Sequence, residues 1–549
     1  MLKKASAVFL TLVMALAMAV PALADEADPY EYDDIAIVSY QAVVEGFDWG
    51  PGITQIILTL NAEAAPEDIN YEDFAVVVNR QPGFQMALDP NADTVEEMRI
   101  VTGAFPSDAN GTRTSEASSF ITLQLAVSPQ MGNPFTFVLS PMGNDWADPY
   151  AHTITWHGQD FTPEFNGRIM PLASLFNITG RFTGSDGQSL QYAYYSPNAQ
   201  TPRPLLIWLH GAGEGSRGGT VTPYSTLLGN RVTQLVAPEI QGIMGGAYVL
   251  TPQAPTIWLS GTSGEYDYRY RSNYEVAMME LIRHFIDTTP GVDPNRVYIG
   301  GCSNGGFAVK RAMFLGPELF AAAWPICPVY HDIWVTEEKM ESIAHIPTWL
   351  VHDINDPTVV YAHSQNFYDA MLAVGAPNVH ITLTDGLYDT TGQFFDEDGN
   401  PHRFNDHWSW IPVLNNEITD PRGTSIFAWM AEQTLEGAPA EPEPVDDVIT
   451  PARIQVGSTT ITVAGETQIV DAAPFMADGH RVMVSIYTAA ALFGLDVYTL
   501  SLPAGVALPG GLGTPVEVEG IFFVPLRYVA MQFDATVAWN ATAQAVYIS

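Results

Sequence analysis

The stretch RVYIGGCSNGGF, residues 296–307, decides the fold of this chain. Its β-branched and aromatic beginning, residues 296–299, predicts a strand, and the pentapeptide GCSNG follows at residues 301–305. Glycines two residues before and two residues after Ser303 permit a sharp turn from strand into helix, because they relieve crowding at the turn. Such a turn exposes the Ser303 hydroxyl as a candidate nucleophile. The pattern is short enough to arise by chance, so the rest of the chain must support it.

Strand and helix patterns alternate on both sides of this turn. Apolar strand patterns lie at residues 205–209, 247–250, 321–324, 348–351 and 380–383, and helix patterns lie at residues 274–288 and 364–374. This alternation predicts an α/β fold, a doubly wound and mostly parallel sheet with helices on both faces, between about residues 165 and 435.

A glycine-rich loop, HGAGEG at residues 210–215, follows the predicted strand 205–209. A serine nucleophile needs N–H donors for the negative charge that develops on the attacked carbonyl oxygen. The loop precedes the Ser303 turn in the order expected for this kind of site. The backbone N–H groups of Ala212 and Asn304 are therefore the candidate oxyanion hole.

The candidate acid lies in HDINDP, residues 352–357, where the predicted strand 348–351 ends. A carboxylate just beyond a strand can orient a histidine on a neighbouring loop. Asp356, in the turn itself, is the preferred acid, and Asp353 is the alternative. Either carboxylate could instead cap the turn.

The candidate base must follow the acid, because the expected chain order is serine, acid, histidine. Within residues 165–435, the histidines that follow Asp356 are His363, His380, His402 and His407. The first two fall in helix or strand patterns, and the last two lie in the loop PHRFNDHWSW, residues 401–410. His407 is preferred, because Trp408 and Trp410 could wall a pocket beside it.

Aromatic side chains are the candidates for substrate contact. Trp258, Trp408 and Trp410 are the residues predicted to contact the substrate, and Tyr266, Tyr268 and Tyr270 are further candidates. Core packing is the commoner use of such side chains.

Five motifs, one of which contains the serine turn, carry a resemblance to a known family. They are HGAGEG at 210–215, TPQAPTIW at 251–258, DPNRVYIGGCSNGG at 293–306, HDINDPTVV at 352–360 and DHWSW at 406–410. With these motifs, residues 165–435 resemble the α/β-hydrolase superfamily, in particular secreted esterases related to polyhydroxybutyrate depolymerases and feruloyl esterases. The resemblance implies a triad of Ser303, Asp356 and His407. Relatives usually have glycine where Asp353 stands, which leaves the choice of acid open.

Short alternating runs separated by Pro, Gly, Asn and Asp occupy residues 35–156. They predict a β-sandwich over residues 30–160. This region resembles the immunoglobulin-like (Ig-like) domain that precedes some bacterial esterases, so a support or binding module is expected.

A linker rich in proline and acidic residues is predicted at residues 436–449. Beyond it, VSIYTAAALFGLDV at 484–497 matches VPLRYVAMQFDATV at 524–537 with an offset of 40 residues, which predicts one small α+β domain over 450–549. This region resembles the copper amine oxidase N-terminal-like domain. It has His480 but no other histidine and no cysteine, so a stalk or cell-surface role is expected and copper binding is not.

Residues 1–24 have the pattern of a secretory signal: Lys3 and Lys4, an apolar run at 5–20, and PALA at 21–24. Cleavage is expected near Ala24, which predicts a secreted or surface-associated bacterial protein. A retained membrane anchor is the alternative, although the run is short for a spanning helix.

The composition of the chain excludes some classes of binding partner. With 61 acidic and 22 basic residues the formal charge is −39, which disfavours binding to nucleic acid or to anionic membranes. The two cysteines, Cys302 and Cys327, are expected to be buried thiols, with a bridge between them as the alternative. The acidic turn at 396–400 lacks the later glutamate of a calcium loop, so a solvated turn is favoured. No cofactor or metal is expected, and the oligomeric state stays open.

The leading hypothesis is a secreted serine carboxylesterase that acts on a small-molecule or polysaccharide-linked ester, such as an ester decoration of a plant polysaccharide. The alternatives are a serine peptidase like the prolyl oligopeptidases and a non-catalytic surface-binding protein.

Overall fold

The computed structural model describes residues 35–80, 94–131, 137–138, 144–147, 150–197, 199, 201–215, 222–260, 272–330 and 335–435, together with short stretches between residues 452 and 548. The predicted signal peptide, the predicted linker, Tyr266, Tyr268, Tyr270 and His480 lie outside the described residues.

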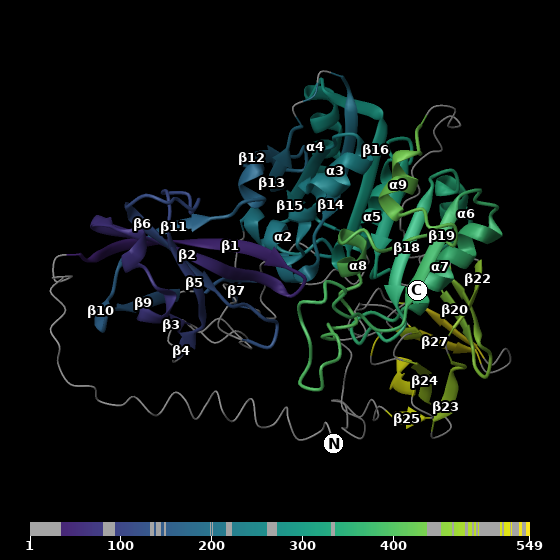
Figure 1. The fold of residues 1–549 in the computed structure, drawn as a ribbon. Helices are drawn as coiled ribbons and strands as arrows, with labels where there is room; N and C mark the ends of the chain where they lie inside the picture. Colours follow the sequence, from purple (N-terminus) through teal and green to yellow (C-terminus); the bar gives the residue numbers. More distant parts are fainter. Residues whose placement is uncertain are drawn as a thin grey trace.

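Two sheets form an N-terminal β-sandwich, drawn in purple and blue in Figure 1. One has the order β11-β1-β2-β6-β5, with bounds Glu164–Ile169, Ile37–Phe47, Gly50–Ala64, Ser118–Leu125 and Val101–Pro106. The other has the order β10-β9-β3-β4, with bounds Gln159–Phe161, Tyr150–Trp156, Phe74–Arg80 and Val95–Arg99. Buried and partly exposed residues alternate strictly along β3, as expected when successive side chains point to opposite faces of a sheet. Val76 and Val78 lie on the buried face.

A short two-stranded ribbon lies apart from both sheets of the sandwich. Within the run at residues 135–140, the described strand β7 (Phe137–Val138) pairs with β8 (Asp145–Trp146) in this ribbon. Strands β4 and β5 were not predicted, because neither carries the long β-branched runs that identify β1–β3.

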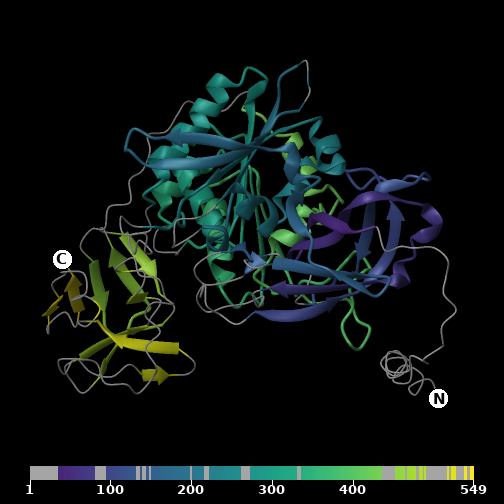
Figure 2. The same cartoon turned by 90° about the vertical axis from the view of Figure 1, so that its left-hand side faces the viewer.

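A large sheet flanked by helices forms the centre of the molecule (Figures 1 and 2). It has eight strands in the order β12-β13-β15-β14-β16-β17-β18-β19. The bounds are Asn177–Thr183, Ser189–Tyr195, Tyr248–Gln253, Arg203–Leu209, Val292–Cys302, Ala322–Ile326, Thr348–Asp353 and Val379–Thr384. All neighbouring strands from β15 to β19 pair in parallel. Strand β13 pairs antiparallel with both of its neighbours, β12 and β15. The α/β prediction is confirmed. Parallel strands end at one edge, so the loops after β14, β16, β18 and β19 converge there.

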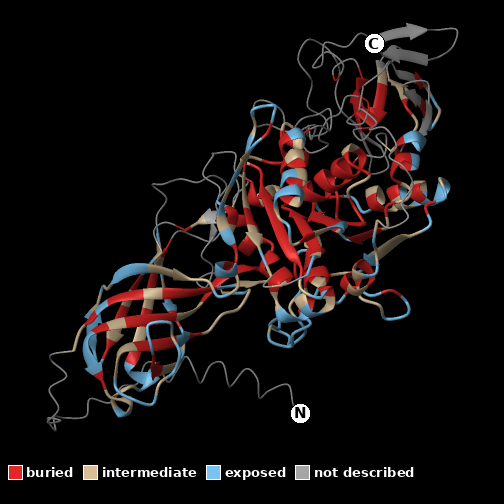
Figure 3. Ribbon diagram, turned by 90° about the horizontal axis from the view of Figure 1, so that it is seen from above, coloured by how far each residue is buried: buried red, intermediate tan, exposed pale blue. Residues whose placement is uncertain are grey.

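Helices cover both faces of this sheet. The helices on one face are α4 (Glu275–Thr288), α5 (Asn304–Leu315), α6 (Glu337–Ile343) and α7 (Ala362–Ala373); those on the other are α2 (Pro223–Gly229), α3 (Pro238–Met244), α8 (Trp410–Leu414) and α9 (Ile426–Ala431). Alternate β14 side chains serve the two cores: Leu206 and Trp208 face one, and Ile207 the other. The sheet is buried throughout its centre (Figure 3). None of the described helices is long and apolar enough to cross a membrane.

Short 3₁₀ turns connect the larger elements: η2 (Pro66–Asp68), η3 (Tyr71–Asp73), η4 (Ala173–Leu175), η5 (Ala212–Glu214) and η6 (Val232–Val236). The core on the α2 face is continuous with the core of the sandwich. The sandwich therefore packs directly against the central α/β part.

The described C-terminal strands form two sheets, β22-β21-β20-β28-β27 and β23-β24-β26-β25. Their bounds are β20 Ala452–Gln455, β21 Thr460–Val463, β22 Glu466–Ile469, β23 Phe475–Ala477, β24 Arg481–Ser485, β25 Val516–Val518, β26 Ile521–Pro525, β27 Val537–Asn540 and β28 Ala545–Ile548. Val484 and Val524, equivalent residues of the predicted repeat, are direct partners in the antiparallel pair β24–β26. The repeated strands therefore pair with each other, and both valines are fully buried.

Candidate active site

Ser303 lies in the turn between β16 and α5, with φ 54° and ψ −115°. A residue other than glycine in such a conformation costs about 1–3 kcal/mol and persists only where its surroundings hold it. Here the Ser303 N–H donates to the Ile326 carbonyl at 2.9 Å, and the Phe307 N–H donates to the Ser303 carbonyl at 3.0 Å. The neighbouring strand and the first turn of α5 thus fix the strained serine.

The two glycines around Ser303 have no room for a side chain. A Cβ atom at Gly301 would lie 2.4 Å from the Leu209 carbonyl oxygen, and one at Gly305 would lie 1.9 Å from the same atom. The end of β14 therefore packs against the turn at backbone distance, which is the close approach that glycine permits.

Substituting Gly305→Ala is expected to destabilise the protein by about 3 kcal/mol, because the new methyl group meets a backbone atom that cannot move aside. Denaturant unfolding and soluble yield would measure this. Gly242→Ala, in α3 with open space around the new Cβ, is the matched control. Equal stability of the two variants would contradict the packing described here.

His407 and Asp356 are joined by a hydrogen bond of 2.7 Å from the His407 Nδ1 to the Asp356 Oδ2. The Asp356 side chain is fully buried, and its Oδ1 accepts from the N–H groups of Thr358 and Val359 at 2.7 and 2.9 Å. With Nδ1 donating to the carboxylate, the His407 Nε2 is left free to act as a base. Asp356 follows β18 and His407 follows β19, so both lie at the sheet edge where Ser303 lies.

The charge of Asp356 is stabilised although the group is buried. Burial alone raises the pKa of this carboxyl, but hydrogen bonds from His352 and His407 outweigh burial and hold its pKa well below its usual range. The carboxylate therefore stays charged at neutral pH and keeps His407 oriented.

His352 is a second histidine on this carboxylate, which the sequence analysis did not assign. Its Nε2 lies 3.1 Å from the Asp356 Oδ2 and 3.0 Å from the Val359 carbonyl oxygen. Because both neighbours accept, Nε2 carries the proton, and Nδ1 accepts from the Ser364 hydroxyl at 2.7 Å. Burial lowers the pKa of His352, consistent with a neutral ring. The four-residue spacing in HDIND was the available signal.

Asp353, the alternative acid, is turned toward the end of β19. Its Oδ2 accepts from the Thr384 hydroxyl at 2.7 Å and from the Gly386 N–H at 2.8 Å. Its own N–H donates to the Ser409 hydroxyl at 3.0 Å. Asp353 thereby links β18 to the loop that carries His407, and it makes no hydrogen bond with His407 in the structure described.

Of the two tryptophans in DHWSW, Trp410 packs against His407, and Trp408 packs against Trp410. The Trp410 ring meets the His407 ring edge-on at 5.8 Å, and the Trp408 and Trp410 ring centres are 6.3 Å apart. Cys327 donates its thiol to the His407 carbonyl at 3.3 Å. His407 is therefore held by its side chain, its ring face and its backbone.

Trp258 was expected to contact a substrate, and this expectation was wrong. Its side chain is fully buried, and its ring packs 5.2 Å from the His210 ring. Its backbone N–H donates to the Asn304 Oδ1 at 2.7 Å. Trp258 is a packing residue that connects the segment after β15 to the start of α5.

The proposed oxyanion donors begin two helical turns. Ala212 is the first residue of η5 and Asn304 the first of α5, and the first N–H groups of a helix have no partner within it. His210 shapes the loop: its Nδ1 donates to the Gly211 carbonyl at 2.7 Å, and its Nε2 accepts from the Ala254 N–H at 3.1 Å. Burial lowers the pKa of His210 to about 4, so the ring is neutral.

Two other sequence expectations concern thiols and metals. Cys302 and Cys327 are both buried and free, so the alternative of a bridge is wrong. The Cys327, Asp356 and His407 ligand atoms lie within 4.8 Å of one another, but the hydrogen bond between the last two accounts for this cluster. In the exposed turn at 396–400, the Asp396 Oδ1 accepts the N–H groups of Asp398 and Asn400, as in an ordinary turn.

Glu214 is buried directly behind the glycine-rich loop, with 4% of its surface exposed. Burial raises the pKa of its carboxyl to about 7, even though hydrogen bonds from Asn230, Gly211 and Asn144 favour the charged form. The buried Cys302 thiol is a titratable group close to this carboxyl.

This shift predicts a pH dependence of stability. The folded protein holds the Glu214 proton up to about pH 7, whereas the unfolded chain releases it near its ordinary pKa of 4.5. Stability therefore falls as pH rises from about 4.5 to 7, by about 3 kcal/mol from this group. In Glu214→Gln this slope should disappear, as thermal unfolding between pH 4 and 8 would measure. Parallel curves for both proteins would contradict the assignment.

The comparisons with known proteins agree with this fold. Residues 39–163 match the model described as Esterase Ig-like N-terminal domain, and residues 269–350 match the Prolyl oligopeptidase family. Among solved structures, a thermostable esterase shares 22% identity and a TM-score of 0.56, covering 72% of this chain and 99% of its own. No curated protein matches the sequence.

A ferulic acid esterase, at 14% identity and a TM-score of 0.30, covers 38% of this chain and 91% of its own; this likeness is too low to carry an argument. The central fold is that of an α/β-hydrolase, and the segment before it matches an esterase Ig-like domain. More particularly, these matches support a serine hydrolase.

Proposed function

We propose that the protein is a secreted serine carboxylesterase that hydrolyses carboxylic esters through an acyl-enzyme. The observation that carries the proposal is the strained Ser303 at the same sheet edge as the 2.7 Å hydrogen bond between His407 and Asp356. An activated serine requires this combination of nucleophile, base and orienting acid.

In the proposed reaction Ser303 attacks the ester carbonyl carbon while the His407 Nε2 takes the hydroxyl proton. The N–H groups of Ala212 and Asn304 stabilise the oxyanion of the tetrahedral intermediate. His407 then gives the proton to the leaving alcohol, which leaves an acyl group on Ser303. Water, activated by the same histidine, releases the acid and restores the serine. Asp356 keeps the imidazole oriented and stabilises its charged form.

A peptidase is the second candidate, because residues 269–350 match the Prolyl oligopeptidase family. The Ig-like match at residues 39–163 favours the esterase instead, since it occupies the part of the chain that would have to gate a peptidase site. A non-catalytic surface-binding protein is the third candidate. The presence of serine, aspartate and histidine in the chain order of a serine hydrolase argues against it.

Purified protein assayed with p-nitrophenyl esters of graded chain length, feruloyl esters and peptide anilides should hydrolyse esters at least about 100-fold faster than anilides. Equal or faster anilide hydrolysis would favour the peptidase. Failure of Ser303 to react with a fluorophosphonate probe would reject both enzymes and favour a binding protein.

The proposed enzyme is exported and held at the cell surface by the segments outside its α/β part. A signal peptide cleaved near Ala24 would bring the enzyme to ester-decorated polysaccharide outside the cell, and residues 450–549 would attach it to the cell surface. Mass spectrometry of the N-terminus of protein recovered from the culture medium would test the cleavage site, and an intact Met1 there would contradict it.

A further inference from the structure

We propose that Asn144, which reaches from the Ig-like module, holds the glycine-rich loop at 210–215 in place, so that this module is part of the catalytic unit. The inference rests on the proposed function, because the loop carries the proposed oxyanion donor Ala212. Asn144 acts through the loop and is therefore a positioning residue.

Asn144 binds the two residues that follow Ala212. Its backbone N–H donates to the Gly213 carbonyl at 2.6 Å, and its Nδ2 donates to the Glu214 Oε1 at 3.0 Å. A Cβ atom at Gly213 would lie 3.1 Å from the Asn144 Nδ2. The side chain therefore packs on the loop as well as bonding to it.

The remaining contacts of Glu214 come from the α/β part of the chain. Its carbonyl accepts from the Gln253 Nε2 at 2.8 Å. Cβ atoms at Gly211 and Gly229 would lie 3.0 and 3.1 Å from its carboxylate oxygens. The carboxylate thus fills the space behind the loop, and Asn144 binds it from the Ig-like module.

The ribbon that carries Asn144 is itself anchored. Trp146, in β8, meets the Tyr224 ring of α2 edge-on at 6.4 Å, and the Arg168 guanidinium of β11 lies 4.1 Å above its ring. The Ser225 hydroxyl, also in α2, donates to the Asn144 carbonyl at 3.4 Å. The ribbon therefore connects the sandwich to α2, and Asn144 is placed between them.

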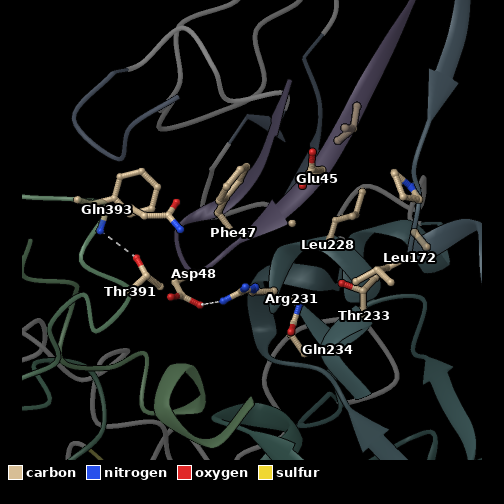
Figure 4. Close-up of a pocket in the computed structure, with 15 residues that line it drawn as sticks. Glu45, Phe47, Asp48, Leu172, Leu228, Arg231, Thr233, Gln234, Thr391 and Gln393 are labelled. Atoms are coloured by element: carbon tan, nitrogen blue, oxygen red, sulfur yellow. Dashed lines mark hydrogen bonds and ion pairs between the residues drawn. The ribbon is translucent and has the colours of Figure 1, made fainter. Parts of the chain in front are cut away.

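A second contact between the two modules lies away from this loop and provides a control. Asp48, at the tip of the β1–β2 hairpin, is paired with Arg231 at 2.5 Å and accepts from the Asn415 Nδ2 at 3.2 Å. This ion pair lies beside a cavity of about 290 Å³. Figure 4 shows the pair, with Phe47 on the sandwich side and Gln234 on the other. Among the described residues, Asp48 makes its hydrogen bonds and ion pair with Arg231 and Asn415, and none with residues 210–215.

The test compares Asn144→Ala with Asp48→Asn in full-length protein, using p-nitrophenyl acetate. Misplacing an oxyanion donor lowers the rate of the chemical step more than it weakens substrate binding. For Asn144→Ala we expect kcat to fall about 10- to 100-fold while KM stays within about 3-fold. For Asp48→Asn we expect kcat to stay within about 2-fold.

Replacing the Asn144 side-chain donor by an acceptor tests the hydrogen bond from Asn144 to Glu214 on its own. Assayed at pH 8, where Glu214 with its pKa of about 7 is ionised, Asn144→Asp keeps the size of the side chain but places a carboxylate against the Glu214 carboxylate. Its kcat should therefore fall at least as far as that of Asn144→Ala. Adding Glu214→Gln restores a donor opposite an acceptor, and the double variant should recover kcat to within about tenfold of wild type.

Hydrogen exchange at residues 205–215 provides a readout independent of turnover, and it should speed up in Asn144→Ala but not in Asp48→Asn. Unchanged kcat and exchange in Asn144→Ala would overturn the proposal, as would equal losses in the Asp48→Asn control. If wild type hydrolyses no ester, the proposed function fails, and the exchange measurement alone decides whether Asn144 holds the loop.

Discussion

Replacing Ser303 by alanine is expected to reduce ester hydrolysis by about a million-fold, to the level left by binding and the oxyanion hole. The alanine methyl group fits where the serine Cβ lies, so the hydrogen bonds from the turn to Ile326 and Phe307 persist. The strained backbone is held by those bonds and not by the hydroxyl. The variant should therefore be folded but inactive, as steady-state assays and thermal unfolding would measure.

A matched control separates the role of Ser303 from that of its surroundings. Cys302→Ala changes the adjacent buried side chain, whose pKa is raised by burial and which is therefore an inert thiol. This variant should retain fluorophosphonate labelling, whereas Ser303→Ala should lose it. Labelling of Ser303→Ala at the wild-type rate would reject Ser303 as the nucleophile.

The second large effect is expected for Asp356→Asn, which should lower kcat by about 10⁴-fold. An asparagine presents both an acceptor and a donor where the ionised aspartate presents only acceptors, so the His407 Nδ1–H loses its charged partner. His352, on the same oxygen, loses its partner as well. Because the low pKa of Asp356 comes from these bonds, the variant should also lose stability at neutral pH.

Asp353→Asn is the comparison that decides between the two acids. Its carboxylate accepts from Thr384 and Gly386, so this variant should lower the unfolding midpoint while kcat changes by less than about tenfold. Stopped assays for kcat and thermal unfolding of both variants provide the measurement. A larger loss of kcat in Asp353→Asn than in Asp356→Asn would reverse the assignment of the acid.

Much of the fold was predictable because its signals are local. The apolar runs that became β14, β16 and β18 lie between glycine, proline and histidine loops, and this local pattern suffices to predict buried parallel strands. The same holds for the turn at Ser303, whose glycines are required by the approach of β14. Strand β4 was missed because its residues, VEEMR, carry little of the β-branched pattern.

The site was predictable only in part, because side-chain direction depends on packing between distant segments. Nothing in the sequence distinguished a buried Trp258 from one that lines a cleft. The four-residue spacing of His352 and Asp356 permits their contact but does not require it, since it depends on how the loop after β18 folds back. The contact of Asn144 with Glu214 spans 70 residues and two modules. Such contacts follow from how the modules pack.

The sequence by itself determined the α/β class, the serine turn with its obligatory glycines, and the order in which the candidate nucleophile, acid and histidine follow one another. These features depend on backbone sterics and on hydrophobic periodicity, which act over a few residues. The tertiary structure decided the partner of His407, the burial of Trp258 and the place of the Ig-like module beside the glycine-rich loop. Those depend on atoms brought together from far apart in the chain, where distances of an ångström separate a hydrogen bond from no interaction.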